Sequence, residues 1–243
     1  MHSATFLKTL AAGAILASGL AGAVGSAFAA DVVKRPAPVV VAAPTHTWDL
    51  LFGVTATSQY FSRGIAQSTG AAIQPWAELD VNSFYLGYWG SNVSPSLLSG
   101  AHFENDLSVG WRPTHGPLTF DFGYVRYVYD VSSIDYGEVY GKVSVNPVQP
   151  LTLGASIFYN PDASTTYIEG NAKVALHSGF SVSGAIGSQD GTMSWNAGAS
   201  WQPHDWLTLD GRYYGGPSGG GANKFVVSVA FATSLKKLGG GKY

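Results

Sequence analysis

The residues of this chain that could do chemistry are charged side chains that recur at every second position. The acids of this set are Glu78, Asp80, Glu104, Asp106, Asp121, Glu138, Glu169 and Asp210. The bases are Arg63, Arg112, Lys142, Lys173 and Arg212. Because successive side chains of a β-strand point to opposite faces, we expect all of them on one face. Such charges could draw ions along a watery path, or they could pair with one another.

The residues at the alternate positions, which face the other side of the strands, are apolar and aromatic. In the segment Phe225–Phe231, the odd positions carry Phe, Val, Val and Phe, while the even positions are small or polar. A charge on a lipid-facing strand position costs about 2–4 kcal/mol at mid-bilayer, so this pattern is typical of a barrel with a wet interior. Arg126 is the exception, and we expect its long side chain to reach toward lipid phosphates from the end of its strand.

The composition supports a barrel embedded in a membrane. Charged residues make up 12% of the 243 residues, against about 25% in ordinary soluble domains, and aromatic residues make up 13%. After the amino-terminal region, no stretch is long and apolar enough for a membrane helix. Cysteine is absent, which excludes disulfide bonds and thiolate chemistry, and nothing in the charge balance points to a nucleic-acid partner.

The chain divides into four predicted regions. Lys8, an apolar stretch and Ala27-Phe28-Ala29 predict a signal peptide over residues 1–29. Residues 30–47 carry three prolines and are interpreted as a periplasmic linker. Residues 48–233 are assigned to an outer-membrane β-barrel, and residues 234–243 to a C-terminal tail.

Within the barrel region, alternation and turn residues predict about twelve strands. They are expected at 49–64, 73–81, 84–92, 102–112, 118–128, 136–146, 151–159, 165–176, 180–188, 192–201, 206–214 and 224–232. Turn-forming Asn, Pro and Gly residues fall at every second connection. The predicted fold is therefore all-β, an antiparallel up-and-down transmembrane β-barrel with both chain ends in the periplasm.

Catalysis is the weakest of the functional classes considered. Some outer-membrane barrels use a Ser/His pair near the rim, but His115, His177 and His204 fall in predicted turns, and only His102 falls at a strand end. No Gly-x-Ser-x-Gly motif and no ligand spacing for a metal occurs. We expect no enzyme activity, no cofactor and no metal.

Several blocks resemble one family. The stretch Ser58–Ser68, SQYFSRGIAQS, resembles the opening motif of the TorF-type porins, a bacterial outer-membrane family also described as proteins of unknown function. Ala72-Ile73-Gln74, the block 84–93 and Tyr136–Tyr140 agree in the same order. The resemblance covers most of residues 52–231. Here the leader is longer than expected, and twelve residues follow Phe231, which ends a pattern similar to an outer-membrane assembly signal.

Two hypotheses follow for the outer membrane of a Gram-negative bacterium. In the first, the resemblance implies a porin that passes small hydrophilic solutes or ions by diffusion, and the thirteen charges line its lumen. In the second, the charges pair and fill the lumen of a non-conducting structural or surface-interaction barrel. Arg63 is expected to point inward from the first strand and to pair with Glu78 or Glu104. The expected partners are outer-membrane lipid and the barrel-assembly machinery.

Overall fold

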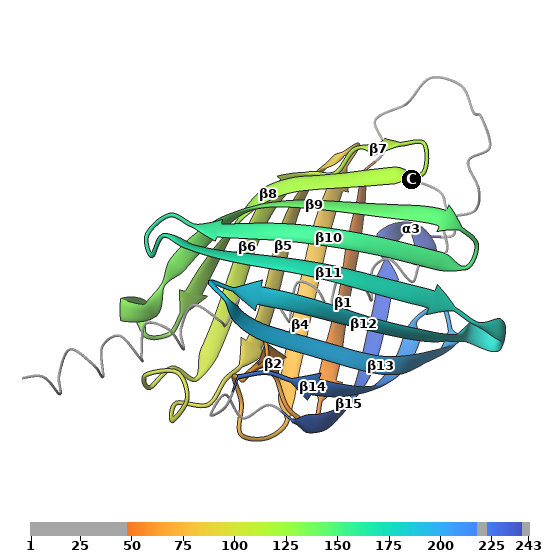
Figure 1. Ribbon diagram of the computed structural model, residues 1–243. Coiled ribbons are helices and arrows are strands. Elements are labelled where there is room, and N and C mark those ends of the chain that lie inside the picture. The colour runs from red at the N-terminus through yellow and green to blue at the C-terminus, as the bar shows by residue number, and fades with distance from the viewer. Residues whose placement is uncertain (1–47, 218–222, 240–243) are drawn as a thin grey trace, which may run out of the picture.

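The computed structural model describes residues 48–217 and 223–239. The predicted signal peptide at 1–29, the Pro-rich linker at 30–47 and the last residues of the tail lie outside this part of the chain. The described residues are almost entirely β-strand, and Figure 1 shows them as one continuous wall around a central axis.

Within the described residues, twelve long antiparallel strands form the wall. They are β1 (Trp48–Thr57), β4 (Ala72–Val81), β5 (Phe84–Asn92), β6 (Phe103–Trp111), β8 (Leu118–Tyr129), β9 (Tyr136–Val148), β10 (Leu151–Asn160), β11 (Thr165–Ala175), β12 (Phe180–Gln189), β13 (Thr192–His204), β14 (Leu207–Gly215) and β15 (Lys224–Ser234). Each pairs with its sequence neighbour, and β1 pairs with β15 from Leu51↔Ser234 to Thr57↔Ser228, which closes the ring. The predicted up-and-down barrel is confirmed.

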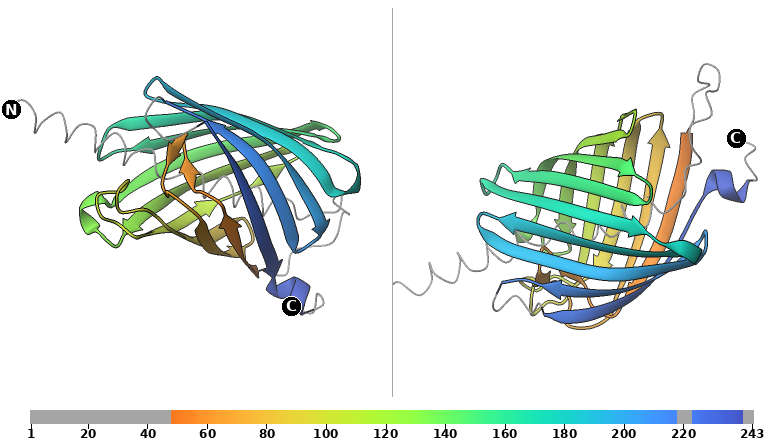
Figure 2. Two further views of the ribbon diagram at one scale, coloured as in Figure 1. Left: turned by 90° about the horizontal axis from the view of Figure 1, so that it is seen from below. Right: turned by 45° about the vertical axis from the view of Figure 1, so that its right-hand side comes forward.

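The two ends of the barrel differ. At the terminal end, where β1 begins and β15 stops, short turns join the strands, including the small strand β7 (Thr114–His115) and the 3-10 turn η2 (His177–Gly179). The helix α3 (Leu235–Leu238) follows β15 at this end, capped by the Ser234 side chain (Figure 2, right). The opposite, loop end carries the longer connections, among them the segment 58–71 and the 3-10 turn η1 (Ser132–Ile134).

Aromatic side chains form two bands on the outer surface. Exposed rings near the terminal end belong to Phe84, Trp111, Phe122, Phe180, Trp201, Trp206 and Phe231. Exposed rings nearer the loop end belong to Tyr159, Trp195, Tyr213 and Phe225. Neighbouring rings stack across strands, as Trp206 does on Phe231 with centroids 6.0 Å apart. Exposed aliphatic residues lie between the bands, as Val227 does between Phe225 and Phe231 of β15, an arrangement typical of barrels that span a lipid bilayer.

The interior also contains aromatic side chains, although the alternation pattern assigns aromatic residues to the outer face. Six tyrosines on the interior phase of the wall are buried, namely Tyr85, Tyr127, Tyr129, Tyr136, Tyr140 and Tyr167. Tyr85 and Tyr140 lie flat over Gly110 and Gly123 of the adjacent strands, where a Cβ atom would overlap their rings. The interior is therefore a mixed surface of charges and tyrosine hydroxyls.

The predicted first strand, 49–64, is too long. β1 ends at Thr57, and the chain then turns inward into a hairpin of β2 (Phe61–Ser62) and β3 (Ile65–Ala66). Arg63 and Gly64 are the two turn residues, with φ of 47° and 77°, as a two-residue type I′ hairpin requires. Figure 2 (left) shows this hairpin within the ring of strands. We call residues 58–71 the inner segment.

Candidate functional site

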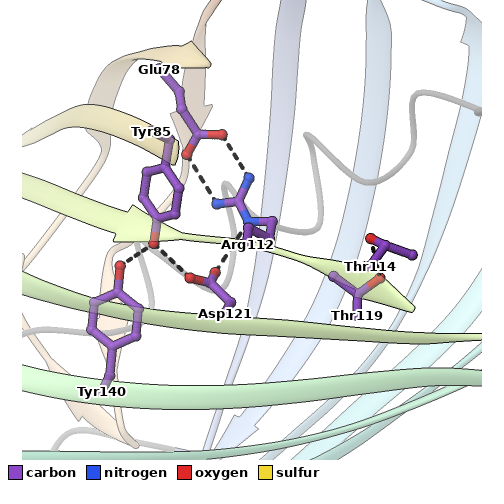
Figure 3. Close-up of polar contacts among 7 residues, drawn as sticks. All are labelled: Glu78, Tyr85, Arg112, Thr114, Thr119, Asp121 and Tyr140. Carbon is purple, nitrogen blue, oxygen red and sulfur yellow. Dashed lines mark hydrogen bonds and ion pairs between the residues drawn. The ribbon is translucent and has the colours of Figure 1, made fainter. Parts of the chain in front are cut away.

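One ionic cluster lies in the terminal half of the lumen. Arg112, directly after β6, donates two hydrogen bonds to Glu78 of β4, from Nη1 to Oε1 at 2.8 Å and from Nη2 to Oε2 at 3.2 Å. Its Nε donates to Asp121 Oδ2 of β8 at 3.2 Å. Figure 3 shows the guanidinium between the two carboxylates. Residues far apart in sequence meet here because the strands β4, β6 and β8 bring their terminal ends together.

Tyrosine hydroxyls complete this terminal cluster. The Tyr85 hydroxyl donates to Asp121 Oδ1 at 2.8 Å and shares a short hydrogen bond with the Tyr140 hydroxyl (Figure 3). The Arg112 guanidinium also lies over the Tyr85 ring, 4.2 Å from its centroid. The sequence prediction missed both tyrosines, although Tyr85 and Tyr140 share the interior phase with residues such as Glu138.

A second cluster lies at the loop end, and it corrects the predicted partner of Arg63. Arg63 donates to Glu138 of β9 through both terminal nitrogens, at 3.0 and 2.7 Å. The predicted partner Glu78 binds Arg112 instead. The prediction failed because Arg63 belongs to the hairpin turn and not to a barrel strand, so strand phase does not determine its direction.

Arg63 is also held by aromatic rings and a side-chain amide. Its guanidinium carbon lies 4.4 Å from the Tyr167 ring centroid, and Nη1 donates to Gln189 Oε1 at 3.1 Å. Burial alone lowers the pKa of the Arg63 guanidinium, but the attraction of the Glu138 carboxylate outweighs this effect and raises the pKa above its ordinary value. Arg63 therefore stays charged at any physiological pH.

Glu104 and Asp106 lie close to the loop-end cluster on β6. Both side chains are buried, and Glu104 Oε1 accepts a hydrogen bond from the Tyr129 hydroxyl at 2.8 Å. Asp106 Oδ1 is buried and has no hydrogen-bond donor among the described residues. The loop end of the lumen is therefore richer in acids than in bases.

The other predicted lining residues are spread over the remaining wall. Arg212 and Asp210 pair within β14 at 3.0 Å, and Arg212 also binds Asn196 of β13 and Ser183 of β12. Lys142 lies over the Tyr140 ring at 4.5 Å, and Glu169 accepts from the Tyr167 hydroxyl at 2.8 Å. Asp80 and Lys173 are partly exposed on the interior phase of β4 and β11.

Water reaches the two clusters to different extents. The Arg112 and Glu78 side chains are 34% and 18% exposed, whereas those of Arg63 and Glu138 are 2% and 1% exposed. The inner segment covers the loop-end pair, and no comparable segment among the described residues covers the terminal cluster. The ion pair of the terminal cluster is thus partly accessible to solvent, whereas the ion pair at the loop end is buried.

The described residues bring together no group of three or more His, Asp or Glu side chains that could hold a metal ion. Among the helical segments of residues 48–217 and 223–239, none has the length and apolar character of a membrane span.

Comparisons with known proteins agree with this geometry at the level of fold. A family model described as a bacterial protein of unknown function (Gcw_chp) matches residues 41–217. The TorF name, which the sequence resemblance suggested, is not part of this family description. None of the curated proteins matches the chain in sequence.

The solved structures that resemble the chain include porins with the same barrel. The KdgM porin is 8% identical, with a TM-score of 0.57, and the match covers 74% of this chain and 98% of that one. A KdgM porin in complex with disordered oligogalacturonate is 6% identical, with a TM-score of 0.53 and coverage of 76% and 97%. The NanC porin is 11% identical, with a TM-score of 0.50 and coverage of 74% and 97%. At these identities the similarity establishes the fold alone.

Proposed function

The chain belongs to the Gcw_chp family of bacterial proteins of unknown function, and from its barrel we propose that it is an outer-membrane porin. Small hydrophilic solutes or ions would diffuse passively through its narrow, charged lumen, without a cofactor. The protein would reside in the outer membrane of a Gram-negative bacterium, where lipid surrounds it and the barrel-assembly machinery inserts it.

The observation that carries this proposal is the separation of the two faces of the wall. Charges and hydroxyls face inward, while exposed aliphatic residues between two aromatic bands face outward. A wall of this kind is stable only with lipid outside and polar groups or water inside. The shared fold with the KdgM and NanC porins supports the same function.

The lumen charges predict a preference for cations. Eight acids and five bases are candidates for the lining, and a ring of acids attracts cations in a pore. The partly exposed terminal cluster would meet the solute first from that side, and Glu104 and Asp106 would act at the loop end.

A second function is favoured by the ion pairs. Arg63 with Glu138 and Arg112 with Glu78 and Asp121 neutralise much of the interior charge. A barrel filled in this way could serve as a structural or surface-interaction protein that conducts nothing. Twelve-stranded barrels lie between small filled barrels and wide porins, so both functions fit the size of the ring.

Planar bilayers separate the two functions. We expect stepwise conductance from the purified, folded protein, and folding is checked by heat-modifiable migration on gels. Neutralising the acids with Glu104→Gln and Asp106→Asn should reduce the preference for cations, whereas Asp162→Asn on an exposed loop should not. A folded protein that never conducts would establish the non-conducting barrel, and recovery in the soluble periplasmic fraction would contradict the membrane assignment.

A further inference from the structure

The inner segment crosses the loop end of the lumen and contacts well-separated strands of its wall. Tyr60 packs on Trp89 of β5, with ring centroids 5.4 Å apart. On the other side, Phe61 stacks on Tyr214 of β14 at 5.3 Å and joins Ala66 and Val226 of β15 in a small apolar cluster. These contacts lie on either side of β1, because β5 and β14 are each two strands away from it around the ring.

The turn of the hairpin is the best-anchored point of this segment. The Arg63 guanidinium binds Glu138 of β9 and lies over the rings of Phe158 and Tyr167 from β10 and β11. Next to it, Gly64 lies against β13 so closely that an added Cβ would stand 2.7 Å from the Ser194 Cβ. Ser194 is consequently buried beneath the turn.

The inner segment is held in shape by hydrogen bonds among its own residues. The Tyr60 carbonyl accepts from the Gln67 amide at 2.8 Å, the Ser68 hydroxyl accepts from the Tyr60 amide at 2.8 Å, and Gln59 Nε2 donates to the Ser68 carbonyl at 2.7 Å. The segment is also tied to the loop after β5, because the Ser94 hydroxyl accepts from the Thr69 amide at 2.8 Å and the Gln67 carbonyl accepts from the Ser94 amide at 2.9 Å. Release of the segment from the wall would break these hydrogen bonds and the Arg63–Glu138 ion pair, but not the hydrogen bonds within the segment.

We propose that the inner segment is a plug that closes the loop end of the lumen, with the Arg63–Glu138 ion pair as its lock. This inference rests on the proposed function in one respect, since release of the plug would open the passage. When the plug leaves, Glu138 loses its cation, and together with Glu104 and Asp106 it forms an acidic mouth that attracts cations. Movement of such loops is a common way to control access to a site.

Thiol labelling tests the plug without any need for conductance. The chain has no cysteine, so Ser194→Cys places a single thiol beneath the turn, and Thr208→Cys places a control thiol on the interior phase of β14, in the terminal half. A water-soluble, cationic thiol reagent should label position 194 slowly. Breaking the lock with Arg63→Gln or Glu138→Gln should accelerate labelling at 194 at least tenfold and leave labelling at 208 unchanged.

Charge reversal provides the matched control. The double variant Arg63→Glu with Glu138→Arg should return labelling at position 194 toward the slow rate of the parent. Equal labelling rates in the parent and the lock variants would overturn the plug. Failure of all lock variants to show heat-modifiable migration would also overturn it, because a releasable plug cannot be required for closure of the ring.

The two proposals can fail separately. A barrel that never conducts but shows accelerated labelling in the lock variants would retain the plug and lose the porin. A barrel that conducts identically in the parent and in the lock variants, with unchanged labelling, would retain the porin and lose the plug.

Discussion

Arg63 and Arg112 each make a bidentate contact with a glutamate, but the two ion pairs differ in their exposure to water. Arg63 and Glu138 are almost completely buried, whereas Arg112 is about one-third exposed. Removing one partner of a buried ion pair leaves a charge without solvation, but an exposed pair is screened and contributes little. Substitutions in the two ion pairs should therefore differ in their effect on stability, although the contact geometry of the pairs is similar.

Glu138→Gln should lower the free energy of unfolding by about 3 kcal/mol, the low end of the range for a broken buried pair, because the turn can move Arg63 toward water. The double variant Arg63→Gln with Glu138→Gln should recover most of this loss, since neither charge remains. Urea unfolding followed by heat-modifiable migration measures both values. Equal losses in the single and double variants would show that the two side chains are not coupled.

Arg112→Gln should act mainly on selectivity. Its loss leaves Glu78 and Asp121 without their cation in the half of the lumen that water reaches, so the preference for cations should rise, while stability falls by only about 1 kcal/mol. Reversal potentials in a salt gradient measure the change. Lys237→Gln, on α3 outside the lumen, is the matched control, and a shift of the same size there would contradict a role for Arg112 in the lumen.

At the scale of the strands, the alternation of polar and apolar residues predicts most of the observed barrel strands. Eleven of the predicted strands agree with the observed ones within about three residues, because each has one apolar and one polar face. The inner segment was missed because Gln59, Phe61 and Arg63 continue the phase of β1, and a period of two does not reveal a chain reversal. The signal available was Gly64, since Arg-Gly between Ser62 and Ile65 fits a two-residue turn.

The prediction that the outer face of the strands contacts lipid can be tested on β13. Ala197 is exposed near the middle of β13, and Ala197→Lys should destabilise the folded barrel in lipid by about 2–4 kcal/mol, the cost of a lipid-facing charge at mid-bilayer. Ala197→Leu, which enlarges the side chain without adding charge, should have little effect. Unfolding in lipid vesicles measures both variants, and equal stability of the two would place this face of β13 away from lipid.

At the scale of the whole molecule, the strand pairing that closes the barrel does not depend on the inner segment that lies in its lumen. The pairing of β1 with β15 and with β4 closes the ring without the inner segment. Charge phase predicted an interior for residues such as Glu104 and Asp121, because every strand of a barrel faces the same lumen. It could not predict which interior charges meet, because strand tilt and loop path determine those contacts.

This separation predicts the behaviour of a chain without its inner segment. Thr57 of β1 pairs directly with Ala72 of β4, so residues 58–71 can be replaced by Asn-Gly, which forms a two-residue hairpin at such a pair. The shortened chain should fold into a heat-modifiable barrel, and in vesicle swelling it should admit larger neutral solutes than the parent. The control is a chain that keeps residues 58–71 but carries Thr69→Ala on the exposed side of the segment, which should behave as the parent does. Unchanged solute size after the replacement would mean that the lumen is narrowed by the wall tyrosines and ion pairs, and not by the inner segment.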